Sequence, residues 1–277
     1  MQDDVETLPP TPAPTPAPPP AAGARPAGPG AAERLSAAAE AVARVRARAP
    51  RVHCLTNMAA ASLSANGLLA LGATPSLTDD PGEAAAFTAG ADALAVNLGT
   101  PDARRSDAID AAVAAAREAG APWVLDPVMV DRAPVRRAEA LRLLRWKPAI
   151  LRVNEDERAS LFDGADAPAF AGALAVSGRA DRLSRDGAAV RVFNGHALAP
   201  RITGSGCLLG ALMGAVLAVE RDPLQAALAA TLALGVASEI AGAEARGPGS
   251  FQPALLDALY ALTPQTILER GRIACDG

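Results

Sequence analysis

The chain has 277 residues and a net charge of −4, with 20% charged residues. Because no basic run accompanies this acidic balance, nucleic acid is not expected as the main partner. Three scattered cysteines and two histidines suit a reducing compartment, predict a cytoplasmic protein, and argue against a disulfide framework or a zinc cluster. The most apolar stretches, 207–219 and 224–243, read as buried helices, so no membrane partner is expected.

The first 30 residues hold ten of the 24 prolines, mixed with Ala, Thr and Gly. Such a segment cannot bury a core, so we expect a disordered or polyproline-like tail. It also lacks the continuous apolar run of a signal peptide. The remaining residues, 31–277, fit one α/β domain.

Short apolar runs alternate with amphipathic segments from residue 52 onward. Repeated strand–helix units predict a parallel sheet that is covered on both faces, with ligands bound at the carboxyl ends of its strands. In chain order we expect a strand at 52–55, a helix at 62–71, a strand at 74–77, a helix at 81–89, a strand at 93–96, a helix at 102–119, a strand at 123–125, a helix at 136–144, a strand at 149–152, a helix at 155–161, strands at 173–176 and 188–193, and helices at 207–219, 224–243 and 252–262.

The sequence TGSGC at 203–207 directly precedes a long apolar run. Gly204 and Gly206 let the backbone turn tightly and approach a bound group. A helix that starts here presents unpaired N–H groups and the positive end of its dipole, which bind anions such as phosphate and favour a Cys207 thiolate. The alternatives are an ordinary glycine-rich loop before a buried helix, and a Cys207 that merely packs.

Polar residues follow five of the expected strands. Because the carboxyl ends of parallel strands meet at one edge of a sheet, their coincidence with the glycine motif favours a shared site. Each of them alone is also explained as a helix cap or a turn residue. The polar residues are Thr56 and Asn57, then Asn97, Gly99 and Thr100, then Asp126, then Arg152, Asn154 and Glu157, and finally Ser177 and Gly178.

Phosphoryl transfer is one reaction that these residues could perform, because it needs a divalent cation, phosphate donors and an acceptor hydroxyl. Asp126 and Glu157 are candidate ligands for Mg²⁺, which prefers oxygen. Arg152 can hold a phosphate with its planar fork of donors, and the amides of 204–207 can stabilise the transferring group. Cys207 would take the hydroxyl proton or lie near the oxygen that loses it, although Asp is the more obvious base.

Seven segments, in family order and spanning about 52–262, together resemble hydroxyethylthiazole kinase, a thiamine-salvage enzyme of the ribokinase-like superfamily. The resemblance implies a ribokinase-like three-layer sandwich with a mostly parallel central sheet. It also implies a homotrimer with active sites between subunits. The segments are VHCLTN at 52–57, ANGLLALGA at 65–73, NLGT at 97–100, LDPV at 125–128, KPA at 147–149, TGSGC at 203–207 and GPGSF at 247–251.

The activity that the resemblance implies is ATP- and Mg²⁺-dependent phosphorylation of the primary alcohol of 4-methyl-5-(2-hydroxyethyl)thiazole. The residue roles follow from position in the family motifs. They are Cys207, Gly204 and Gly206 for catalysis, with Cys207 where related sugar kinases have their catalytic Asp; Arg152, Ser177 and Asn154 for ATP; Leu77, Gly204 and Asn57 for the thiazole alcohol; and Asp126 and Glu157 for magnesium.

The chain departs from the family pattern at several positions. Ser177 stands where Thr is usual, Leu77 where Met is usual, and Val153 where the family has Gly. The segment 161–173 lacks about one helix and its connection, which would expose one face of the sheet near the nucleotide site. Two further hypotheses therefore accompany the thiazole kinase: a kinase of another small alcohol, such as a pyrimidine or a sugar, and a degenerate homologue that binds ligand without turnover.

Overall fold

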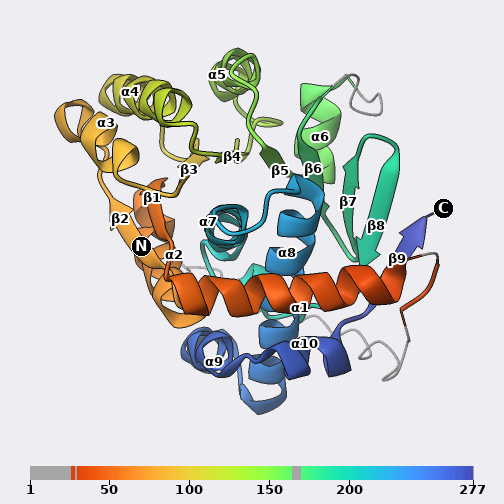
Figure 1. Ribbon diagram of the computed structural model, residues 1–277. Helices are drawn as coiled ribbons and strands as arrows, with labels where there is room; N and C mark the ends of the chain where they lie inside the picture. The colour runs from red at the N-terminus through yellow and green to blue at the C-terminus, as the bar shows by residue number, and fades with distance from the viewer. Residues whose placement is uncertain (1–25, 29, 164–169, 277) are drawn as a thin grey trace, which may run out of the picture.

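The strands follow the apolar runs of the sequence and join into one sheet. The computed structural model describes residues 26–28, 30–163 and 170–276, and their nine strands pair in the order β2-β1-β3-β4-β5-β6-β7-β8-β9 (Figure 1). Pairing is parallel from β2 to β6 and antiparallel from β6 to β9. The strands are β1 (Arg51–Leu55), β2 (Thr74–Leu77), β3 (Ala93–Asn97), β4 (Trp123–Asp126), β5 (Ile150–Asn154), β6 (Ala173–Ser177), β7 (Asp181–Arg185), β8 (Ala188–Val192) and β9 (Ile273–Asp276).

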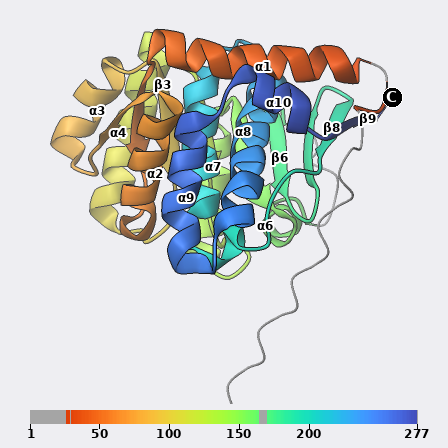
Figure 2. The same cartoon turned by 90° about the horizontal axis from the view of Figure 1, so that it is seen from below.

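Helices cover both faces of this sheet, which confirms the expected layered α/β fold (Figures 1 and 2). Helices α3 to α6 lie on one face. Helices α2, α7 and α8 lie on the other, and α1, α9 and α10 pack outside them. The helices are α1 (Ala31–Arg48), α2 (Met58–Leu71), α3 (Pro81–Ala89), α4 (Ala103–Ala119), α5 (Pro134–Leu144), α6 (Glu155–Leu161), α7 (Ser205–Leu217), α8 (Pro223–Glu244), α9 (Pro248–Ala261) and α10 (Pro264–Arg270).

Two buried hydrophobic clusters, one on each side of the sheet, hold the layers together. The larger cluster lies around α7 and α8 and includes Leu208, Leu212 and Phe251. The smaller one packs α4 to α6 against β3 to β6. Among the described helices α8 is the one long and apolar enough to cross a bilayer, and 72% of its most apolar window is buried within the fold. Its apolar surface therefore serves the larger core.

Five elements lie outside the sequence-based expectations: α1, β7, the short 3-10 helix η1 (Ala199–Arg201), α10 and β9. Their apolar signals are weak, since β7 buries Leu183 alone and α10 buries Ile267 alone. Helix α1 buries mostly alanine, which hardly distinguishes a core face in an Ala-rich chain. Helix α7 begins at Ser205, two residues before the expected start, because the TGSGC turn itself forms its first turn.

A row of glycines lets α7 lie close against the sheet. Gly206, Gly210 and Gly214 recur every four residues, so they share one face of the helix. A Cβ added at Gly210 would stand 3.4 Å from the Asp126 Cβ, and one at Gly214 would stand 3.2 Å from a Val52 methyl. The close packing places the N-terminus of α7 at the carboxyl ends of β4 and β5.

An open groove of about 300 Å³ lies over β6 to β8 on the face that also carries α6. Its floor includes Leu174 and Val176 of β6, and its rim includes Arg158 and Arg182. Segment 161–173, for which the sequence analysis expects a missing helix, precedes β6, and residues 164–169 of it lie outside the described residues.

Candidate active site

The TGSGC turn builds the N-terminus of α7. Gly204 is the residue before the helix and has φ of 89°, and a Cβ there would lie 3.0 Å from the Ala60 Cα. Both the left-handed backbone and the close approach of α2 therefore require glycine at this position. No side chain caps the helix, and the amides of Ser205, Gly206 and Cys207 have no acceptor among the described residues. The structure thus presents three free N–H donors at the positive end of a helix dipole.

Asp126 and Arg152 form a buried ion pair beside this helix start. The Asp126 Oδ1 and an Arg152 guanidinium nitrogen are 3.4 Å apart, and the two side chains are 3% and 13% exposed. The other guanidinium nitrogen donates to the Ser177 hydroxyl at 3.1 Å. Burial raises the pKa of Asp126 to about 6, a shift that Arg152 opposes and the Glu157 carboxylate reinforces.

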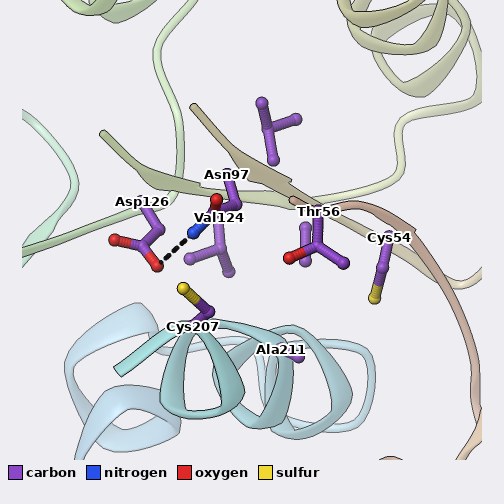
Figure 3. A pocket seen from close by; sticks show the side chains of 10 residues that line it. Cys54, Thr56, Asn97, Val124, Asp126, Cys207 and Ala211 are labelled. Atoms are coloured by element: carbon purple, nitrogen blue, oxygen red, sulfur yellow. Dashed lines mark hydrogen bonds between the residues drawn. The ribbon is translucent and has the colours of Figure 1, made fainter. Parts of the chain in front are cut away.

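Cys207 lies in the first turn of α7, with its sulfur turned toward Asp126 and Asn97 (Figure 3). Burial, aided by the negative charge of Asp126, raises the pKa of this thiol to about 11, although Asn57, Asn97 and Arg152 act in the opposite direction. The expectation that the helix field would favour a thiolate is therefore wrong. Desolvation and a neighbouring carboxylate outweigh the dipole, and Cys207 carries its proton at neutral pH.

The pocket beneath Cys207 is small, about 10 Å³, which is room for roughly one water molecule. Thr56 lines it, and its buried hydroxyl has no hydrogen-bond partner among the described residues (Figure 3). A thiazole ring or a nucleotide cannot enter so small a space, so larger ligands must lie outside it. Exposed apolar side chains occur next to the site, since Met58 is 85% exposed and Met129 is 57% exposed.

Asn154 and Glu157 form a capping box at the start of α6. The Asn154 side chain accepts from the Glu157 amide at 2.8 Å, and the Glu157 carboxylate accepts from the Asn154 amide at 2.8 Å. The second Glu157 oxygen accepts from the Met129 amide at 2.7 Å. That amide belongs to a loop after β4 in which Val128 and Met129 both have positive φ. Glu157 therefore holds a strained turn beside Asp126, in addition to any role toward a metal.

Asn57 and Leu77 occupy different surroundings. Asn57 caps α2 by accepting from the Ala60 amide, and its side-chain amide also reaches Cys207. Leu77 ends β2, is 38% exposed and does not line the pocket below Cys207. The fold therefore joins most of the predicted residues at one place, while Leu77 lies on the outer side of β1.

Val153 points away from the face of the sheet that carries α7 and Arg152. Side chains alternate along a strand, so Arg152 faces α7 whereas Val153 faces α6. Val153 is fully buried in the cluster that packs α4 to α6. Its branched side chain fills space in this core, on the face of the sheet opposite to Arg152.

Two further residues of the site were not singled out by the sequence. Arg105, which is 4% exposed, donates to the backbone carbonyls of Thr56 and Asn97 at 2.6 and 2.8 Å and so ties the ends of β1 and β3 together. Asp181 begins β7, and burial raises its pKa to about 6 against the pull of Arg152. For Arg105, an arginine within the Ala-rich helix α4 was a signal that could have been noticed. For Asp181, the sequence offered no such signal.

The charges beside α7 fit a bound divalent cation. Asp126 and Glu157 are buried carboxylates that repel one another, and Arg152 is the cation paired with Asp126. Two negative charges against one positive charge in a low-dielectric site favour an additional cation with oxygen ligands. Among the described residues there is no group of three metal-ligating side chains, so water and phosphate oxygens would supply the remaining ligands.

The sequence matches a model of the hydroxyethylthiazole kinase family at residues 42–169 and 165–265. The chain belongs to the hydroxyethylthiazole kinase family. It is 40% identical to the hydroxyethylthiazole kinase of Clavibacter sepedonicus over 257 residues, covering 85% of this chain and 94% of that protein. A hydroxyethylthiazole kinase structure from Pyrococcus horikoshii OT3 is 35% identical, with a TM-score of 0.82, and the match covers 87% of this chain and 99% of that one.

The expected ribokinase-like architecture is confirmed by more distant structures. Pyridoxal kinase from Staphylococcus aureus in complex with AMP-PCP and pyridoxal superposes with a TM-score of 0.57 at 16% identity, which shows a shared fold alone. Within the hydroxyethylthiazole kinase family the chain length varies. A probable hydroxyethylthiazole kinase of Agrobacterium fabrum aligns over 236 residues, again 85% of this chain, so that alignment needs almost no gap here. The longer alignment with the Clavibacter enzyme shows residues that this chain lacks.

Proposed function

We propose that this kinase transfers the terminal phosphoryl group of ATP to the primary alcohol of 4-methyl-5-(2-hydroxyethyl)thiazole, in thiamine biosynthesis. The observation that carries the proposal is the juxtaposition of three free amides at the start of α7 with the buried Asp126–Arg152 pair. A loose phosphoryl-transfer transition state needs charge stabilisation and positioning more than a strong base. Family membership supports the choice of thiazole alcohol.

In this proposal each group has a role that its surroundings allow. The amides of Gly206 and Cys207 hold the transferring group, with Gly204 setting the turn and contacting the alcohol. Arg152 and Ser177 contact the ATP phosphates, with Asn154 next to them on β5. The Cys207 thiol, protonated at neutral pH, lies beside the acceptor oxygen and positions it. Asp126, supported by Glu157, would hold Mg²⁺, which neutralises phosphate charge when bound.

We further propose that residues 31–277 act as one kinase domain in a cytoplasmic homotrimer, with Leu77 and Asn57 on the thiazole side. The pocket beneath Cys207 is too small for the thiazole, and exposed Met58 and Met129 flank the site, which suits completion of the pocket by a neighbouring subunit. The apolar helix α8 is mostly buried within these residues, which supports a single domain without a membrane span. Sedimentation equilibrium tests the assembly, and a monomer with full activity would contradict it.

Purified protein supplied with Mg-ATP and the thiazole alcohol tests the activity directly. We expect ADP to form only when the alcohol is present. The matched control is the double variant Cys207→Ala, Asp126→Ala, which keeps the sheet and α7 but loses the thiol and the carboxylate. Turnover no greater than that of the control would reject the proposal. A panel of pyrimidine and sugar alcohols separates the thiazole kinase from a kinase of another alcohol.

A further inference from the structure

We propose that Asn97 is a positioning residue for the phosphoryl transfer, because with Asn57 it forms a one-directional chain of amide hydrogen bonds that fixes Asp126 and Cys207 relative to each other. The inference rests on the proposed function, since those two residues serve the phosphate and the alcohol in it. Asn97, at the end of β3, belongs to none of the residue roles assigned above.

The chain of hydrogen bonds is continuous. The Asn97 amide nitrogen donates to the Asp126 Oδ2 at 2.7 Å (Figure 3), and the Asn97 Oδ1 accepts from the Asn57 Nδ2 at 2.9 Å. The same Asn57 nitrogen lies 3.4 Å from the Cys207 sulfur and donates to it. Asn57, Asn97 and Asp126 are 7%, 5% and 2% exposed, so water hardly competes for these bonds.

The direction of these bonds is fixed at both ends. An ionised carboxylate can only accept, so the Asn97 nitrogen must face Asp126. The Gly99 amide donates to the Asn97 Oδ1 at 3.0 Å, and the Ala60 amide donates to the Asn57 Oδ1 at 3.1 Å. These two backbone N–H groups fix the orientation of both side-chain amides. The Cys207 sulfur must therefore accept the hydrogen bond from Asn57. Its own hydrogen must point away from Asn57, toward other acceptors.

The backbone around the chain is built for this arrangement. Gly99 admits the Asn57 side chain, because a Cβ there would lie 2.7 Å from the Asn57 nitrogen. Buried Arg105 clamps the carbonyls of Thr56 and Asn97, the residues at the two loop entries. Rigid loop ends keep both amides in hydrogen-bonding range, which is what a positioning device needs.

A double-mutant cycle on Asn57→Ser and Asn97→Ser tests the proposal. Serine remains a good N-cap at 57 but cannot span to the sulfur or to Asn97. Each single variant should lower kcat about tenfold to a hundredfold, as for loss of a hydrogen bond to a charged or reacting group. Both KM values of Asn97→Ser, and the KM for ATP of Asn57→Ser, should stay within about threefold of wild type. The double variant should lose no more than the worse single variant, because either change breaks the same chain.

Losses that multiply in the double variant, or KM changes without loss of kcat, would overturn the inference. Thermal melting accompanies the kinetics, and if Asn97→Ser does not fold, Asn97→Ala takes its place, since it also removes the donor to Asp126 without adding a charge. An inactive wild type would instead refute the proposed function, and the inference with it.

A second readout needs no substrate. In the ligand-free protein, alkylation of Cys207 by iodoacetamide is followed by peptide mass spectrometry, with Cys275 as the internal reference. The isosteric Asn57→Asp keeps the cap on α2 but removes the donor to the sulfur, so alkylation of Cys207 should slow at least severalfold. An unchanged or faster rate would contradict the proposed bond from Asn57.

Discussion

The guanidinium of Arg152 lies directly over Gly206, so close that a Cβ on this glycine would stand 2.8 Å from both terminal nitrogens. A strand-end cation and a helix N-terminus therefore converge on the same small volume. Either feature alone attracts an anion weakly, whereas together they provide planar donors from one side and backbone donors from the other. This combination suits the phosphoryl group of the proposed reaction.

Gly206→Ala should impair nucleotide use without unfolding the protein. The added methyl must displace the Arg152 guanidinium, so kcat/KM for ATP should fall about tenfold or more. Gly210→Ala is the matched control on the same helix face, because its Cβ would meet Asp126 at an ordinary 3.4 Å. Equal kinetics for the two variants would show that the approach of Arg152 to α7 does not matter for catalysis.

Gly204→Val should abolish turnover. The residue has φ of 89° and lies against Ala60, so a branched side chain is excluded both by its backbone and by α2. The first turn of α7 must then shift, and its free amides shift with it. Steady-state assays and melting curves measured together would decide, and an active, stable variant would count against the anion-binding role.

Arg152→Ala should raise the KM for ATP by about tenfold or more while the KM for the alcohol changes less. Arg182→Ala provides a control, since that arginine lies on β7, two strands from β5 and on the opposite face of the sheet, and is exposed. An unaltered nucleotide KM in Arg152→Ala would rule out phosphate contact by this residue.

Asp181 predicts a pH dependence of stability. Its pKa in the folded protein is raised to about 6 from 3.8, so the folded state binds the proton more tightly than the unfolded chain. The protonated side chain therefore adds stability below pH 3.8, and this contribution is lost as the pH rises through about 6. Asp181→Asn keeps the acceptor for the Gly178 amide and should melt a few degrees higher than wild type at pH 8. The advantage should shrink at pH 4, and an equal difference at both values would disprove the assignment.

Val153→Gly tests whether the departure at this position harms the nucleotide site. Because Val153 is buried in the core, the change should destabilise the protein by roughly 2–4 kcal/mol through a cavity and a flexible backbone. The KM for ATP should stay within about twofold of wild type. Tighter ATP binding by the glycine variant would mean that valine does restrict the nucleotide, as a degenerate homologue would require.

The elements that position the site could be predicted because their apolar runs are short, buried and clearly bounded. Strand β3 buries all five of its residues and β4 all four, so both appear directly in the sequence. An Asp-Gly pair is a typical hairpin-turn signal, and Asp186 and Gly187 both have the positive φ of a tight hairpin. Strand β9 could not be predicted, because its four residues gain their place from pairing with β8 at the far end of the chain.

The residues that make up the site could be predicted, but their ionisation states could not. Parallel strand ends bring Asn57, Asp126 and Arg152 together by topology alone. The ionisation of Cys207 depends on burial and on the distance to Asp126, neither of which the sequence reveals. The three-residue spacing of Asn154 and Glu157 is enough to predict their capping box. The hydrogen bond from the Met129 amide to Glu157 joins distant parts of the chain, so it could not be predicted.

The groove over β6 to β8 has a consequence for how the molecule opens. With one face of these strands lying toward solvent, β7 and β8 bury few of their residues, whereas β3 and β4 are enclosed on both sides. Amide hydrogens in the β7–β8 hairpin should therefore exchange with deuterium through local fluctuations, well before those of β3 and β4, which require much larger unfolding. The strands that carry the candidate site can thus stay folded while the β7–β8 hairpin unfolds locally.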